Sequence, residues 1–278
     1  MPWVESVSPS FRARHDSRDA DDAAQVLESL ERARDRLDAV FARTVGDLTV
    51  VLHQSDNQLR LARPLLPVAR LLVAPAARRY VVGSVSRDEI HVLSPAAARE
   101  RASNVPGSLE MLRLAPAALY ARRVLAEVNP GLPPPARPGR VVRGLRWAWL
   151  VEGAARFLVG QVEHARPAIA RRLHEGERPQ FPPGVRDATL LGGTVVELLV
   201  REQGPPAVAR MVERLHPDGP RAALVDAFGG RPLGRTEDAW RSHLARYGEG
   251  RRPAGLAQDI RAEPGDDRHD GDGDQEPG

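Results

Sequence analysis

The stretch WAWLVEGAARFLVGQ, residues 147–161, decides how the rest of this chain is interpreted. It reads as a helix that carries a single carboxylate, Glu152, on an otherwise apolar run. The residues next to this carboxylate are apolar or small, which predicts that it is buried: Trp149, Leu150, Val151, Gly153, Ala154 and Ala155. Because an unpaired buried carboxylate is costly, the sequence predicts that Glu152 has a specific partner.

The same stretch resembles the second zinc-binding helix of the gluzincin metallopeptidases, the peptidase MA-like group. In that family a W-L-x-E-G-x-A pattern supplies the last metal ligand. The resemblance covers roughly residues 1–247 and rests on further segments: EIHVLSP (89–95), an expected helix over 108–127, LLGGTVVELLVREQG (190–204) and WRSHLAR (240–246). It implies an α+β, zincin-like fold, with a small mixed sheet in the N-terminal half followed by a mainly helical C-terminal half.

The family also requires an upstream HExxH helix, in which two histidines bind zinc and the glutamate activates the metal-bound water. The matching stretch places Pro116, Ala117 and Tyr120 at those positions, within Pro-Ala-Ala-Leu-Tyr. Proline offers no ligand atom, alanine cannot accept a proton, and a phenol is a poor zinc ligand beside imidazole. The resemblance therefore implies a catalytically inactive, peptidase-like protein without zinc, which retains only the family-like Glu152 and has a binding or scaffold role.

Three partners are conceivable for Glu152. An exposed pair with Arg156, four residues further along the helix, would contribute only about 0.3 kcal/mol. If Glu152 is buried, we expect it to bond to Tyr120, or to an arginine such as Arg186, in place of a metal. If the Tyr120 hydroxyl lies more than about 8 Å from the Glu152 carboxylate, the predicted bond between these two residues is wrong.

Two other functions remain open. One is an active metallohydrolase or peptidase, with zinc as cofactor and an unconventional site that joins Glu152 to Tyr120, His91 or His174. The only His-Glu pair, His174-Glu175, lies in a predicted solvated turn and is followed by arginine where a second histidine belongs. The other is an arginine-rich interaction protein whose face contacts an acidic partner.

The amino-acid composition excludes several kinds of chemistry and bears on the kind of partner. All 40 basic side chains are arginine, so Schiff-base and phosphate-loop lysines are excluded, and the lack of cysteine excludes thiolate chemistry. No secretory signal or apolar run of membrane-spanning length appears, which predicts a soluble, cytoplasmic protein. The net charge of +3 combines −6 over residues 262–278 with about +9 elsewhere. In the body most arginines lie near acids, a pattern that favours a protein or peptide partner over nucleic acid.

The chain is expected to form one domain over residues 1–247, followed by a disordered acidic tail over 248–278. Short strands or a hairpin are expected at 4–15, a helix at about 19–43, a strand at 48–54 and two strands at 78–93. The proline-rich segment 56–79 favours brief helices or loops, and GLPPPARPGR (131–140) predicts an extended connection. Helices are expected after the strands, at about 95–101, 108–129, 147–161, 166–173, 188–201, 205–215, 220–228 and 236–246. The helical stretch over 108–129 is expected to be capped by Ser108 and interrupted at Pro116.

Overall fold

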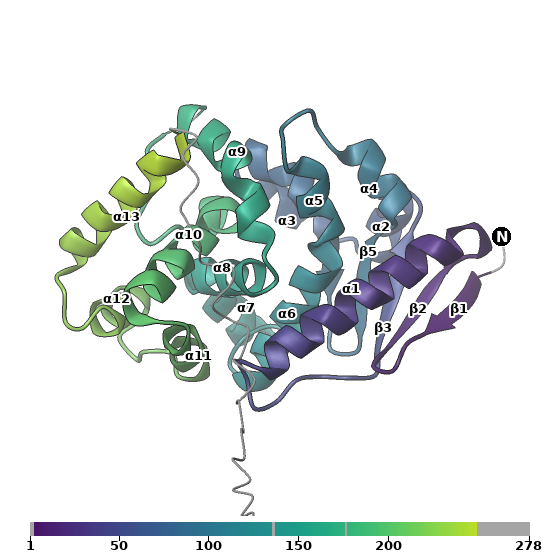
Figure 1. Cartoon of the computed structure of the whole chain (residues 1–278), viewed down its shortest axis with the longest axis horizontal. Helices are drawn as coiled ribbons and strands as arrows, with labels where there is room; N and C mark the ends of the chain where they lie inside the picture. Colours follow the sequence, from purple (N-terminus) through teal and green to yellow (C-terminus); the bar gives the residue numbers. More distant parts are fainter. Residues whose placement is uncertain (1–2, 135–136, 176, 249–278) are drawn as a thin grey trace, which may run out of the picture.

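A computed structural model describes residues 3–134, 137–175 and 177–248 of the chain. The architecture is α+β, with a small sheet formed by the N-terminal half and, among the described residues, a C-terminal half that contains helices and no strand (Figure 1). The predicted fold class is confirmed at this level. The expected tail, 248–278, lies almost entirely outside the described residues.

The sheet has five strands in the order β1-β2-β3-β5-β4. Its strands are β1 (Trp3–Val7), β2 (Phe11–Asp16), β3 (Leu48–His53), β4 (Gly83–Val85) and β5 (Glu89–Leu93). Strands β2, β3 and β5 are parallel, whereas β1 and β4 run antiparallel to their neighbours at the two edges. The predicted hairpin at 4–15 and the two strands within 78–93 are therefore confirmed.

Helix α1 (Ala20–Asp38) connects the parallel strands β2 and β3 and crosses the sheet (Figure 1). It forms because Val26, Leu30, Ala33 and Leu37 recur at helical spacing, and all four are buried. This apolar stripe packs against β2 and against helix α6, so the sheet face and the helical half share one core.

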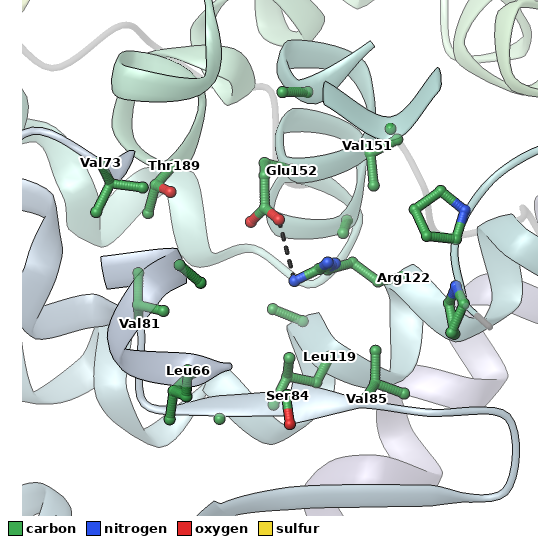
Figure 2. A pocket seen from close by; sticks show the side chains of 18 of the residues that line it. Leu66, Val73, Val81, Ser84, Val85, Leu119, Arg122, Val151, Glu152 and Thr189 are labelled. Carbon is green, nitrogen blue, oxygen red and sulfur yellow. Dashed lines mark ion pairs between the residues drawn. The ribbon is translucent and has the colours of Figure 1, made fainter. Parts of the chain in front are cut away.

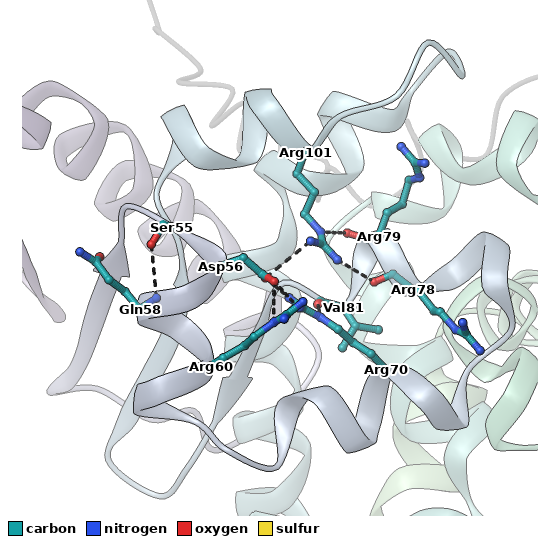
Figure 3. A network of polar contacts seen from close by, with 9 residues as sticks. All are labelled: Ser55, Asp56, Gln58, Arg60, Arg70, Arg78, Arg79, Val81 and Arg101. Atoms are coloured by element: carbon teal, nitrogen blue, oxygen red, sulfur yellow. Dashed lines mark hydrogen bonds and ion pairs between the residues drawn. The ribbon is translucent and has the colours of Figure 1, made fainter.

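The segment between β3 and β4 folds into short helical pieces, as its prolines predict. These are α2 (Asp56–Ala62), α3 (Leu66–Leu72) and the 3-10 helix η2 (Pro75–Tyr80). Asp56 holds them together: its carboxylate pairs with Arg60, Arg70 and Arg101 at 2.7–3.5 Å (Figure 3). Arg70 and Arg101 also donate to backbone carbonyls of residues 78, 79 and 81. This network fixes α3 relative to the sheet.

The remaining helices are α4 (Pro95–Arg101), α5 (Ser108–Arg113), α6 (Ala115–Val128), α7 (Pro138–Arg146), α8 (Ala148–Leu158), α9 (Gln161–His174), α10 (Val185–Gln203), α11 (Pro206–Glu213), α12 (Pro220–Ala227) and α13 (Leu233–Gly248). The largest interface between helices joins α8 to α10, where Gly153 and Gly192 bring the two backbones together. Close packing is thus the role of the Gly192-Gly193 pair.

Two local expectations were wrong. The connection over 131–140 is not extended throughout, because Pro138 stands in the first turn of α7, where a missing N–H costs nothing. Ser108 does not cap its helix: Gly107, with φ of 79°, precedes the helix, and the Ser108 hydroxyl accepts from the backbone N–H of Ser103. The interruption expected within 108–129 falls at Leu114, between α5 and α6, so that Pro116 lies in the first turn of α6.

Candidate functional site: the cavity around Glu152

Glu152 lies in a cavity of about 560 Å³ between the sheet edge and the helical half. The walls come from α3, β4, α6, α7, α8 and the first turn of α10, and most of the side chains are apolar. Figure 2 shows the Glu152 carboxylate and the Arg122 guanidinium facing each other inside this space, with Ser84 and Val85 of β4 on one side and Thr189 of α10 on another.

The Glu152 carboxylate is held by two arginines. Arg122 Nη1 of α6 lies 3.1 Å from Oε1, and Arg156 Nη2, one turn further along α8, lies 3.4 Å from Oε2. Burial by itself would raise the pKa of Glu152, but the positive charges of Arg122 and then Arg156 outweigh it and hold the pKa below its usual value. Glu152 is therefore ionised near neutral pH and has no proton to donate as a general acid.

The cavity carries more positive than negative charge. Its lining includes three arginines, Arg63, Arg122 and Arg156, against the single carboxylate of Glu152. The Nε atoms of all three, and Nη2 of Arg63, are buried without a hydrogen-bond partner in the structure. Buried donors that lack a partner are costly, so these N–H groups favour an anionic or hydrogen-bond-accepting ligand.

The residues expected to replace the HExxH motif do not reach this cavity. Pro116, Ala117 and Tyr120 are buried, and none of them lines it. The Tyr120 hydroxyl donates instead to the backbone carbonyl of Val45, at 2.8 Å, while its ring packs edge-on against Phe11 of β2. The expectation that Tyr120 bonds to Glu152 is wrong, because Tyr120 points toward the sheet and α1 side of its helix.

A different face of α6 lines the cavity, made of Ala115, Ala118, Leu119 and Arg122. Sequence reasoning missed Arg122 because Tyr120 offered the one oxygen-bearing side chain near the expected position. The sequence did carry one signal: Glu152 was predicted to be buried, and a buried carboxylate needs a partner such as an arginine.

Of the other suggested partners of Glu152, Arg156 does pair with it, whereas the remaining ones lie elsewhere. Arg186 pairs with Glu177, at 3.8 Å, and not with Glu152, so this suggestion was wrong. His91 lies between His53, at 3.0 Å, and Glu89, at 3.1 Å. His174 contacts the carbonyl of Ala170 at the end of α9. Neither histidine lines the cavity that Glu152 lines.

The residues around Glu152 do not fit a zinc ion. Both carboxylate oxygens face guanidinium groups, and the side chains that α6 adds are two alanines, a leucine and an arginine. Catalytic zinc takes three protein ligands and a water. Across the described residues, no group of three or more His, Asp and Glu side chains is arranged to hold a metal.

Strand β4 gives the cavity one further feature. It is an edge strand that pairs with β5, and Gly83, Ser84 and Val85 all line the cavity. The Ser84 hydroxyl is buried without a hydrogen-bond partner in the structure. An edge strand presents an unpaired row of backbone N–H and C=O groups, which an extended chain can use.

Comparison with protein-family models, curated proteins and solved structures gave no match for this chain. Within the part of the chain that the structure describes, no helix is both long and apolar enough to cross a membrane.

Proposed function

We propose that this chain is a catalytically inactive, zincin-like protein that binds a peptide in the cavity around Glu152. The observation that carries the proposal is the placement of Arg122 and Arg156 on the two oxygens of Glu152. In a gluzincin the corresponding carboxylate would bind zinc. Here an arginine stands at the position of the second histidine, so a charge-neutralising ion pair replaces the metal centre.

The arrangement of the cavity supports a zincin-like origin. A mixed sheet ends in an antiparallel edge strand, β4, and this strand, the α6 helix and the Glu152 helix border one cavity. In this proposal Ala118, Leu119 and Arg122, which line the cavity, stand in place of the HExxH motif. This register replaces the one expected from Pro116, Ala117 and Tyr120.

The chemistry of the walls indicates the ligand. An extended peptide can pair with the free edge of β4, as peptides add to sheet edges in other binding proteins. The apolar walls favour apolar side chains. The excess of arginine over carboxylate favours an acidic side chain or a free C-terminal carboxylate, to which guanidinium groups bind strongly.

The alternative of an active hydrolase has less support. Glu152 is committed to two arginines, and neither Tyr120, His91 nor His174 shares its cavity. No other side chain that lines the cavity is a histidine or an acid. The third candidate, an arginine-rich protein that contacts an acidic partner, does not account for the largely apolar cavity around Glu152.

Peptide binding is tested by titrating the protein with a library of short apolar peptides that carry either a free or an amidated C-terminus. We expect binding by isothermal titration calorimetry, and a loss of about tenfold on amidation, which matches one charged hydrogen bond. The Ala69→Trp variant should abolish binding, because Ala69 is exposed and lines the cavity. Ala20→Trp, at an exposed position on α1, is the control. Equal binding by both variants would contradict the proposal.

Inactivity is tested separately. Purified protein supplied with zinc should show no peptidase activity. Stoichiometric zinc that resists dialysis, or hydrolysis abolished both by a chelator and by Glu152→Gln, would overturn the proposal and restore the hydrolase.

A further inference from the structure

The exposed apolar side chains of this protein are concentrated in two segments. Among the described residues, eleven large hydrophobic side chains are exposed, and three of these lie on β1. The other eight all come from α2, α3, α7 and the link between α2 and α3: Leu61, Leu65, Val68, Leu71, Leu72, Val141, Val142 and Leu145. Several are extremely exposed, including Leu61 at 85% and Leu71 at 69%.

Both segments border the mouth of the cavity. Leu65 and Leu72 at the ends of α3, and Val141 and Leu145 on α7, line the cavity while remaining exposed. A side chain that is both part of the lining and open to solvent lies at the rim. Helices α3 and α7 therefore flank one opening, and we call the eight exposed apolar side chains of the two segments together the apolar rim. Exposed apolar side chains gathered around one opening mark an interaction site.

Apart from Asp56 at the start of α2, the same two segments contain no acidic residue. Residues 57–87 contain six arginines and no Asp or Glu, and residues 128–151 contain four arginines and no Asp or Glu. In the first segment Asp56 neutralises part of the charge, through Arg60 and Arg70. In the second, Arg137, Arg140, Arg143 and Arg146 recur at every third position along α7. Helix α7 is thus a basic amphipathic helix with its valines and leucine exposed.

We propose that the apolar rim docks on the surface of a bilayer that contains anionic lipid. Exposed leucine and valine side chains gain by entering the boundary between headgroups and acyl chains, while the flanking arginines meet anionic headgroups. A second copy of this chain is a poor occupant, because two rims would bring like charges together. An acidic protein would complement the arginines but offers no comparable reason for so many exposed aliphatic side chains.

This inference does not rest on the proposed peptide binding, because the outermost rim residues take no part in the cavity. Leu71 and Val142 are exposed and do not line it. A variant that carries Leu71→Ser and Val142→Ser therefore changes the rim and leaves the cavity walls as they are. Val7→Ser, at a 70% exposed position on β1, is the matched control for loss of an exposed aliphatic side chain.

The test is co-sedimentation of the full chain with vesicles of phosphatidylcholine alone, or with about one third phosphatidylglycerol. We expect binding to the anionic vesicles, weakened on the order of tenfold by the double serine variant. Arg137→Glu with Arg140→Glu should weaken it further, since each basic residue near an anionic surface is worth about fivefold. Arg12→Glu with Arg235→Glu, at exposed positions outside both segments, is the charge control.

Three outcomes would overturn the proposal: no binding to anionic vesicles, equal binding to neutral vesicles, or equal losses in the rim variants and their controls. Polyglutamate binding that the arginine variant weakens and the serine variant leaves unchanged, without vesicle binding, would assign the surface to an acidic protein instead. Circular dichroism of each variant confirms that it is folded.

Discussion

At the scale of single residues, the placement of charge around Glu152 determines the chemistry of the cavity. On an exposed helix, Glu152 and Arg156 would form a pair of little energetic consequence. Inside the cavity the same pair is joined by Arg122 from another helix, and the Arg156 and Glu152 side chains are only 11% and 19% exposed. Removing the Glu152 carboxylate would leave the two guanidinium groups without their counter-charge. We therefore expect these three side chains to stabilise the fold.

The substitution Glu152→Gln is expected to lower the free energy of unfolding by about 2 kcal/mol at neutral pH, because Arg122 and Arg156 lose their counter-charge. The pKa of Glu152 is lowered in the folded protein from its usual 4.5. Its contribution is therefore complete above about pH 4.5 and is lost as the pH falls through the lower, folded-state pKa. Urea unfolding of both proteins between neutral pH and pH 3 measures this difference.

The wild-type advantage over the glutamine variant should shrink as the pH falls. A difference that stayed constant across this range would show that Glu152 contributes through packing and not through its charge.

His53 provides a second pH-dependent residue. Burial first, and then the charges of His91 and Arg63, lower the pKa of His53 from 6.5 to about 4. A lowered pKa means that the folded protein prefers neutral His53, so its contribution is present above about pH 6.5 and is lost progressively as the pH falls toward 4. Between pH 6.5 and pH 4, we expect the melting temperature of the wild-type protein to fall by roughly 5 °C more than that of the His53→Gln variant. Thermal unfolding monitored by circular dichroism checks this slope, and an unchanged slope would contradict the assignment.

At the scale of elements, the two faces of helix α6 contact different parts of the molecule. Tyr120 lies on the face that packs toward α1 and β2, whereas Arg122 lies on the face that meets α8 across the cavity. Moving the expected motif by two residues, from positions 116, 117 and 120 to positions 118, 119 and 122, transfers it from one face of the helix to the other. The identity of the cavity residues therefore depends on how α6 is oriented between the sheet and α8.

The contact between α8 and α10 depends on glycine. A Cβ atom added at Gly153 would lie 2.4 Å from the backbone carbonyl of Gly192, so the helices would have to separate. We expect Gly153→Ala to destabilise the protein by about 3 kcal/mol, as overpacking does. Gly139→Ala in α7 is the control, because nothing lies within 4 Å of its added Cβ, and it should be neutral or slightly stabilising. Chemical denaturation measures both, and equal stability of the two variants would contradict the close contact.

At the scale of the whole molecule, the cavity lies where the sheet half meets the helical half, with the apolar rim at its mouth. The acidic stretch 262–278 lies outside the described residues, but its charge is known from the sequence. Its removal changes the net charge of the chain from +3 to +9. A more positive protein is attracted more strongly to an anionic surface, and salt screens this attraction.

A chain that ends at residue 261 should therefore bind anionic vesicles about three to ten times more tightly than the full chain at low salt. The difference should fall as salt is added. Co-sedimentation at two salt concentrations measures it, and an unchanged affinity after truncation would show that the charge of the tail does not oppose docking.

The α+β class, the strands and most of the helices could be predicted from the sequence, because apolar periodicity and proline positions are local properties of the chain. It also predicted that Glu152 needs a partner, since the residues beside it are apolar. Arg156 was among the partners considered from the sequence, but the part played by Arg122 followed from three-dimensional packing alone, because the orientation of α6 depends on its contacts with β2, α1 and α8 together. The apolar rim likewise became visible only in three dimensions, where residues 61–72 and 141–145 come together around one cavity.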